Sequence, residues 1–490
     1  MLSDGLLVDT VRGLKWSTIS RISQQGLQYI ATIVLVGVLS PDDFGLMAMA
    51  MVVIGFLDIF KDLGTSSAII KEENPSNELK CSLFWVNVGF GLLIFVIIYF
   101  ASPLLAVLFN SSKVELVLQL LSLSFLFAGF SVLQKALFEK EMSFQILSLI
   151  ELFSSAIAFL VAVYLALNGF GVWSLVWQVV SNTLLNAVLI WIFSNWKPRF
   201  IFKFSELRRI TAYSSNLVGF NIINYFARNG DYFLIGKYLG GFALGHYYLA
   251  YRIMLYPLRN ITMVISRVIF PAFSKIQHDN SKLRDAYIKI TNSIAIITFP
   301  MMAGIAFVSF NFTEAFFGVK WDAVLVAYII IILAPVGALQ SIISTVGNIY
   351  QVKGKTDWMF KWSLFSSTVT LLGFIIGLNW GIIGVATSYL VTNLLLILPV
   401  FIIPFKLVDL PIVKFLRSFE LTVLSVIGML VVLFTASHLL ADNYNNIITL
   451  LILIILGIVS YIVISYIINK KKLKEMKSVI SKYYKATKNN

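Results

Sequence analysis

Long hydrophobic runs, separated by short polar segments, recur along the whole chain. A run of about twenty apolar residues can cross the ~30 Å hydrocarbon core of a bilayer as an α-helix. The expected fold is therefore an all-α polytopic membrane protein with about fourteen transmembrane helices. The predicted spans are 15–38, 43–64, 81–108, 114–136, 146–168, 171–194, 211–236, 243–268, 287–311, 322–351, 357–378, 381–402, 414–438 and 446–469.

Weak internal repeats indicate that the first six spans are duplicated. The segment 34–50 resembles 233–250, which aligns Gly37 with Gly236 and Gly45 with Gly245. Two further matches follow in the same order at offsets of about 200 residues, and repeats in register are typical of duplicated architectures. They pair the Leu-Gln dipeptides at 133–134 and 339–340, and the segments 167–185 and 378–396. Because six is even, both copies start on the same side of the membrane and form parallel repeats.

The duplication predicts two parallel six-helix lobes around a central cavity. The lobes are expected at residues 1–196 and 197–405, followed by an appended pair of spans at 406–469 and a basic tail at 470–490. Every loop on the predicted outer side is short, which leaves no room there for a catalytic or binding domain. The functional site is therefore expected to lie between the helices, and transport is expected to proceed by alternating access.

The composition and the placement of charge support a membrane protein and argue against nucleic-acid binding. The chain of 490 residues is 59% hydrophobic and 13% charged, whereas soluble domains average about 45–50% and about 25%. With a cytoplasmic N-terminus, 31 of the 38 Lys and Arg residues lie in inside segments or at the span ends that adjoin them, and three lie in outside loops. This is the bias of the positive-inside rule, so the net charge of +14 is a topology signal that places both termini in the cytoplasm.

Other residue types exclude further classes of site. The opening of the chain lacks an early apolar core, so no cleavable signal peptide is evident. Cys81 is the single cysteine, which rules out an intrachain disulfide, and three scattered histidines give no metal-ligand pattern.

Three charged residues, Arg228, Asp231 and Arg252, lie inside two predicted spans that flank the glycines 240–241. A charge in the bilayer costs about 2.5–3.5 kcal/mol on insertion scales, so such residues usually face partners or water. Two interpretations remain open. Asp231 can neutralise one arginine and lock two helices together, or the arginines can form a cationic wall for an anionic substrate. Arginine suits a phosphate because its planar group donates two parallel hydrogen bonds.

Three further charged residues in the spans are candidates. Arg259 falls seven residues beyond Arg252, on nearly the same helix face. Arg21 is level with Asp58, Lys61 and Asp62 near the cytoplasmic side, where ion pairing or snorkelling competes with a cavity role. Glu151, near the start of the fifth span, is either a coupling-ion carboxylate or an interfacial residue.

The segment "RNGDYFLIGKYLGGFALGHYYLAYRIMLYPL" (228–258), followed by "VISRVIFPAFSKIQ", resembles the signature of the polysaccharide transporter family. This family belongs to the multidrug/oligosaccharidyl-lipid/polysaccharide flippase superfamily. The segment 13–64 is similar to the opening hairpin of the family, and the likeness is strongest to exporters of the colanic-acid and teichuronic-acid type. The matching signature residues are Arg228, Asp231, Lys237 and Arg252, and no role follows for Lys237. Gly230 departs from the pattern, and no short motif aligns Arg21.

The resemblance implies a non-enzymatic flippase in the bacterial cytoplasmic membrane that moves an undecaprenyl-diphosphate-linked oligosaccharide to the outer leaflet. Expected partners are this lipid-linked anionic oligosaccharide, membrane lipids and polysaccharide polymerase or export machinery. No cofactor is implied, although coupling to protons or sodium stays open. The alternatives are a cation-coupled multidrug exporter of the same superfamily, a polysaccharide polymerase or ligase, and a membrane scaffold. The mainly cationic candidates for the cavity favour an anionic substrate.

Overall fold

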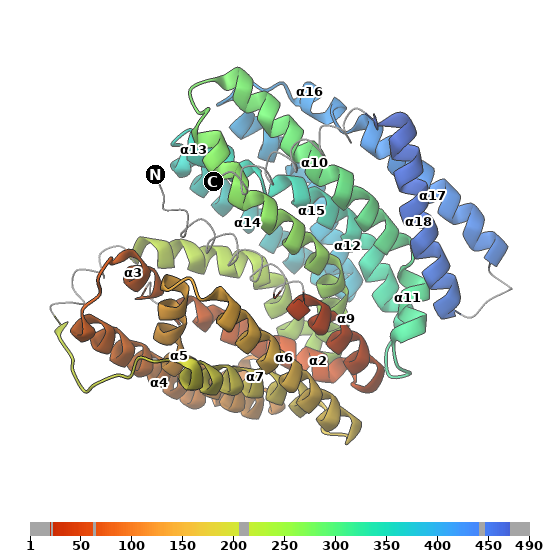
Figure 1. Cartoon of the computed structure of the whole chain (residues 1–490). Helices are drawn as coiled ribbons and strands as arrows, with labels where there is room; N and C mark the ends of the chain where they lie inside the picture. Colours follow the sequence, from red (N-terminus) through yellow and green to blue (C-terminus); the bar gives the residue numbers. More distant parts are fainter. Residues whose placement is uncertain (1–19, 21–22, 62–64, 205–214, 441–445, 471–490) are drawn as a thin grey trace. The chain divides into compact units, whose positions relative to one another are not determined.

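The computed structural model describes residues 20, 23–61, 65–204, 215–440 and 446–470, with side chains at 67–68, 215–224, 226–227, 255–268 and 271–272 excepted. Throughout this part of the chain the regular elements are helices, which confirms the predicted all-α class. The chain divides into two compact units (Figure 1). The first contains residues up to Gly245 together with 318–320, and the second contains 246–317 and 321–489.

The first unit is built from long helices joined by short turns. The first of them is described at residues 23–38. The others are α2 (Pro41–Leu57), η1 (Asp58–Phe60), α3 (Thr65–Lys71), α4 (Asn77–Leu108), α5 (Lys113–Lys140), α6 (Phe144–Leu167), α7 (Val172–Phe193) and the first part of α9 (Ser215–Ser274). The Ser40 side chain caps α2 and the Asp43 side chain accepts from the backbone of Ser40, which fixes the start of α2.

The second unit begins within α9 and has the same construction. It contains α10 (Asn280–Phe307), α11 (Ser309–Phe316), α12 (Ala323–Ile343), α13 (Val346–Val352), α14 (Thr356–Gly377), η2 (Leu378–Trp380), α15 (Gly381–Phe405), α16 (Ile412–Arg417), α17 (Glu420–Leu440) and α18 (Asn446–Ile468). The appended pair α17–α18 packs on α10 and α11. The hydroxyl of Tyr461 on α18 donates to the Ile296 carbonyl of α10 at 2.8 Å.

Each predicted span coincides with a described helix, so the prediction of about fourteen spans is confirmed. Among the described residues, ten segments are long and apolar enough to cross a membrane, and one of them, Thr356–Phe405, contains both α14 and α15. The charged helix α9 is not one of the ten, and its two spans are separated at Gly240. The change of unit at residue 245 also falls within α9, and the lobe boundary at 196–197 stays a prediction.

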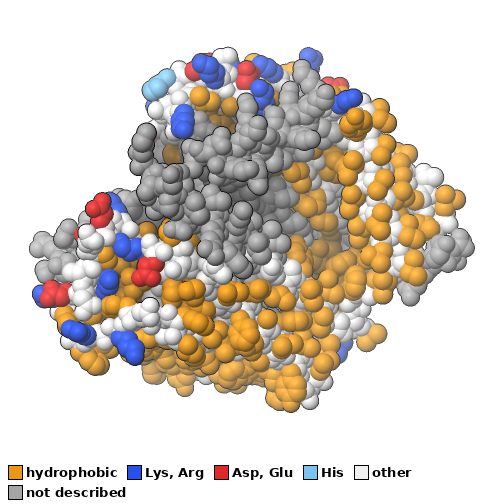
Figure 2. Space-filling model, in the orientation of Figure 1, with side chains coloured by type: hydrophobic (Ala, Val, Ile, Leu, Met, Phe, Trp, Pro, Cys, Tyr) orange, Lys and Arg blue, Asp and Glu red, His pale blue; other side chains and the backbone are white. Residues whose placement is uncertain are grey.

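The flanks of the helices are covered with exposed hydrophobic side chains, as expected for surfaces in contact with lipid. Figure 2 shows these side chains along each unit, with many of the visible Lys, Arg, Asp and Glu residues gathered at one end of each. Phe100, Leu104 and Val107 of α4 are each more than 70% exposed. A soluble protein rarely exposes so large a contiguous apolar surface, so the chain is a multi-pass membrane protein.

The aligned glycines Gly45 and Gly245 make reciprocal close contacts in the first unit. A Cβ atom on Gly45 would lie 1.8 Å from the Gly241 carbonyl oxygen, and a Cβ atom on Gly245 would lie 1.9 Å from the Pro41 oxygen. Position 41 corresponds to 241 when 45 is aligned with 245, so each repeat presents its turn to the glycine of the other. Such reciprocity is what a duplication about a two-fold axis would produce. Only a residue without a side chain permits this approach of the two backbones.

The aligned glycines Gly37 and Gly236 also have neighbours from distant parts of the chain. A Cβ atom on Gly318 would lie 2.6 Å from the Gly37 oxygen, and one on Gly236 would lie 3.4 Å from Cδ1 of Phe109. Gly37 and Gly236 are aligned in the repeat, and each contacts the turn after a later helix of the opposite repeat.

Candidate functional site

Helix α9 carries the charged residues singled out in the sequence and is interrupted between them. Gly240 has a φ of +82° and a ψ of −178°, a backbone conformation that glycine tolerates better than other residues. Arg228 lies twelve residues before this point and Arg252 twelve after it. At ~1.5 Å per residue, each arginine is about 18 Å along its helix from the turn. Both arginines therefore lie well inside the membrane-spanning parts of α9.

In the first unit, the side chain of Arg228 is exposed whereas Asp231 is only 2% exposed. An Asp231 carboxylate oxygen accepts a hydrogen bond from the Tyr232 backbone N–H at 2.9 Å. Between these described side chains, Arg228 and Asp231 form no ion pair. Arg228 is therefore an exposed cation of the first unit, and its substrate-binding role and the orienting role of Asp231 stay predictions.

One turn before Arg228, Tyr225 joins α9 to α2. Its hydroxyl donates to the Val52 carbonyl at 2.7 Å, and a Cβ atom on Gly55 would lie 2.7 Å from the same hydroxyl oxygen. Gly55 thus leaves room for the tyrosine, which fixes the face of α9 that carries Arg228.

In the second unit, Arg252 is half-buried and is held by an aromatic side chain. Its Nη1 donates to the Tyr248 hydroxyl at 3.4 Å, and its guanidinium carbon lies 5.8 Å from the centre of the Tyr248 ring. Among the residues that the structure describes, no carboxylate pairs with Arg252. An arginine at this depth needs water or an anion for its remaining donors.

Tyr251, which neighbours Arg252 on α9, belongs to a cluster of polar and aromatic side chains from α9, α12 and α15 of the second unit. The Tyr251 and Tyr389 rings stack with centroids 6.2 Å apart, and their hydroxyl oxygens are 3.5 Å apart. Gln340 of α12 donates to the Tyr389 hydroxyl at 2.5 Å. Gln340 belongs to the repeated Leu-Gln dipeptide, so this part of the repeat lies near the candidate site.

The remaining predicted cations differ in what can be said of them. The ammonium nitrogen of Lys237 lies 5.5 Å from the centre of the neighbouring Tyr238 ring, near the turn of α9. Asp58 and Lys61 pair with each other at 3.7 Å. Arg21 and the side chain of Arg259 lie outside the described residues, so their roles stay predictions.

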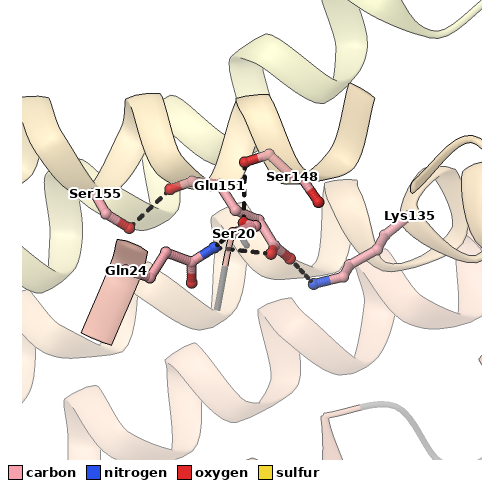
Figure 3. A network of polar contacts seen from close by, with 6 residues as sticks. All are labelled: Ser20, Gln24, Lys135, Ser148, Glu151 and Ser155. Atoms are coloured by element: carbon pink, nitrogen blue, oxygen red, sulfur yellow. Dashed lines mark hydrogen bonds and ion pairs between the residues drawn. The ribbon is translucent and has the colours of Figure 1, made fainter. Parts of the chain in front are cut away.

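Glu151 is the centre of a polar network in the first unit, shown in Figure 3. One carboxylate oxygen lies 2.5 Å from Nζ of Lys135 on α5, and the other accepts from Nε2 of Gln24 at 3.2 Å. Gln24 also donates to Ser20, whose hydroxyl donates to the Ser148 carbonyl at 3.2 Å. The network therefore joins the first helix to α5 and α6.

The Lys135–Glu151 pair lies inside the spans but is not sealed from its surroundings. Lys135 is five residues from the end of α5 and Glu151 is seven residues after the start of α6, so both lie about 8–10 Å inside. Their side chains are 43% and 29% exposed. Hydrocarbon is a poor environment for such groups, so the exposed side of the pair faces water or headgroups.

Sequence reasoning identified Glu151 but missed Lys135 and Gln24. Lys135 lies one residue before the end of the predicted span 114–136, where a lysine is typical of the adjoining cytoplasmic segment. Its pairing with Glu151 depends on the tight turn between α5 and α6, in which Met142 adopts a φ of 55°. Spacing along one helix could not reveal this pairing, although a lysine within an apolar run was a usable signal.

Comparisons with known proteins place the chain in a family. Residues 34–326 match the family model described as "Polysaccharide biosynthesis protein". The match covers more than half of the chain, so the protein belongs to this family. The resemblance found in the sequence is thereby confirmed.

Similar proteins and a similar structure agree with this assignment. The chain is 29% identical over 355 residues to the teichuronic acid biosynthesis protein TuaB of Bacillus subtilis (strain 168), covering 71% of this chain and 72% of TuaB. It is 29% identical over 393 residues to the lipopolysaccharide biosynthesis protein WzxC of Escherichia coli (strain K12), covering 79% of each. A structure of the lipid II flippase MurJ in an inward closed conformation aligns with a TM-score of 0.73 at 18% identity, covering 93% of this chain and 99% of that one. At this identity the alignment shows a shared fold.

Proposed function

We propose that this protein moves an undecaprenyl-diphosphate-linked oligosaccharide from the inner to the outer leaflet of the bacterial cytoplasmic membrane by alternating access. Arg228 and Arg252 bind the diphosphate in this proposal. Family membership supports a role in polysaccharide biosynthesis, and the names of TuaB and WzxC point to surface polysaccharides. The MurJ-like fold supports lipid-linked cargo, because that protein is named as a lipid II flippase.

The physical chemistry of the diphosphate and of the polyprenyl tail supports the same function. A diphosphate is too strongly hydrated to enter hydrocarbon unaided, so it requires a polar path with positive charge. The polyprenyl tail is apolar and can remain in the lipid. A protein whose helix flanks are apolar and whose helix α9 carries Arg228 and Arg252 meets both requirements.

Arg252 carries the proposal. It is half-buried in a membrane-spanning helix, contacts Tyr248, and has no carboxylate partner among the residues that the structure describes. An arginine kept in the membrane only to join helices would be expected to pair with a carboxylate. A guanidinium with further donors besides the one directed at Tyr248 is suited to an anionic ligand that arrives and leaves.

The experiment is export of surface polysaccharide by cells that carry Arg252→Ala or Arg228→Ala. Each variant is expected to abolish export while the protein still inserts into the membrane at normal abundance. Lys113→Ala is the matched control, because it removes the same charge from an exposed position at the start of α5. Full export by either arginine variant would remove that residue from the proposed site.

Coupling to an ion gradient is tested separately. Translocation is measured in proteoliposomes with and without an imposed proton or sodium gradient. Transport that persists without any gradient would exclude obligatory coupling and would leave the binding role of the arginines intact.

A further inference from the structure

The Lys135–Glu151 pair lies near the α5–α6 turn of the first unit, on the side predicted to be cytoplasmic, and is not needed to join its two helices. The turn between α5 and α6 already connects them through residues 141–143. Phe138, Leu147 and Ile150 pack together beside the pair with Ile190 of α7. A partly exposed ion pair is worth a factor of about 5 in the folding equilibrium at most. The pair therefore adds little to packing, although each charge is costly to keep in the membrane.

Glu151 and Lys135 differ in how many of their hydrogen-bonding groups have a partner. Both carboxylate oxygens of Glu151 have a partner, in Lys135 and Gln24. The ammonium of Lys135 has three donors, and Glu151 is its one hydrogen-bond partner among the described residues. With 43% of its side chain exposed, the Lys135 ammonium can be reached by an arriving anion without any rearrangement of the protein backbone.

From this asymmetry we propose that Lys135 is a phosphate-binding residue of the inner half, and that Glu151 occupies it when no phosphate is bound. An arriving phosphate and the Glu151 carboxylate compete for one ammonium group. The carboxylate retains its hydrogen bond from Gln24 when it loses Lys135, so it is not left without a partner. No bond to a heavy atom forms or breaks in this exchange.

The inference rests on the proposed function for its ligand, because the phosphate that reaches this depth is taken to be that of the lipid-linked substrate. An anionic phospholipid headgroup offers the same chemistry from the same leaflet. In this proposal, Lys135 is the first residue that the substrate diphosphate contacts when it enters from the cytoplasmic side. Because Gln24 donates to Glu151, the first helix directly contacts the carboxylate that the phosphate displaces.

The test uses the full-length protein in nanodiscs and farnesyl diphosphate as the probe. In phosphatidylcholine nanodiscs, Glu151→Gln removes the competing charge and is expected to tighten probe binding about 2- to 5-fold. Lys135→Gln is expected to weaken it at least 5-fold. Glu141→Gln is the matched control, because it removes a carboxylate from the exposed turn of the same helix pair. Melting temperatures of all variants verify that they are folded.

The direction in which Glu151→Gln changes probe affinity distinguishes a phosphate-binding Lys135 from a pair that only joins helices. If the pair only joins helices, the substitution would loosen the site and weaken or not alter binding, and this result overturns the inference. Repeating the titration with phosphatidylglycerol present distinguishes the source of the phosphate. A headgroup that occupies Lys135 would lower probe affinity in the wild type and leave Lys135→Gln unaffected.

Failure of this inference is distinguishable from failure of the proposed function. If Arg252→Ala stops translocation but Glu151→Gln binds the probe like wild type, only the inner phosphate site is rejected. If Glu151→Gln binds the probe more tightly but the wild-type protein does not translocate lipid-linked oligosaccharide, only the proposed transport is rejected.

Discussion

Gly45→Ala tests the close contact between the two repeated turns. The added Cβ atom would lie 1.8 Å from the Gly241 oxygen, whereas carbon and oxygen normally approach to about 3.3 Å. The backbones must therefore separate by about 1.5 Å. Overpacking of a tight contact costs about 1–3 kcal/mol, which lowers the population of the closed contact about 5- to 150-fold relative to an open one.

Cross-linking measures this separation directly. A Cβ atom on Gly241 would lie 3.4 Å from Oδ1 of Asp42, so the rate of disulfide formation between cysteines introduced at 42 and 241 is a measure of this approach. Gly45→Ala should slow this reaction strongly and impair export. Gly89→Ala is the control, because a Cβ atom on this exposed α4 residue meets nothing within 4 Å. Unchanged cross-linking and export in Gly45→Ala would refute the reasoning.

Three further predictions concern single side chains. Tyr225→Phe removes the hydrogen bond to Val52 and should lower stability by about 1 kcal/mol in a detergent melt; an unchanged melt would show that the bond contributes nothing. The Asp279 carboxylate caps α10 by accepting the Lys282 backbone N–H at 3.0 Å. This hydrogen bond holds the pKa of the carboxyl below its usual range, so the stabilisation is present above the unfolded pKa near 3.8 and is lost as the pH falls through the folded value. Wild type should therefore lose more melting temperature than Asp279→Asn between pH 6 and 3, and equal losses would argue against the cap. Arg252→Lys retains charge without the planar fork, so partial export is expected; activity as low as in Arg252→Ala would mean that the fork is essential.

The helices could be predicted from the sequence because the bilayer imposes one length on every span. The predicted span 171–194 and the observed α7 (Val172–Phe193) differ by one residue at each end. The two spans of α9 were also separated correctly, because Gly240 and Gly241 interrupt an otherwise continuous run. Such agreement follows from the requirement that each backbone polar group be satisfied within its own helix.

The side-chain partners could not be predicted to the same degree. Gly45 and Gly245 were aligned from the sequence, but their contact depends on packing between elements about 200 residues apart. Lys135 and Glu151 meet because of the geometry of one turn, and a lysine near the end of a span looks like a loop residue in the sequence. Hydrophobic periodicity fixes where helices lie along the chain and carries no information on which polar groups face each other.

Translocation of a fluorescent undecaprenyl-diphosphate-linked oligosaccharide in proteoliposomes is the most direct test of the central claim. Loss of a hydrogen bond to a charged group costs about 1.5–3 kcal/mol, so Arg252→Ala is expected to slow translocation by about 10- to 150-fold relative to Lys113→Ala. Translocation by Arg252→Ala at the wild-type rate would contradict the account.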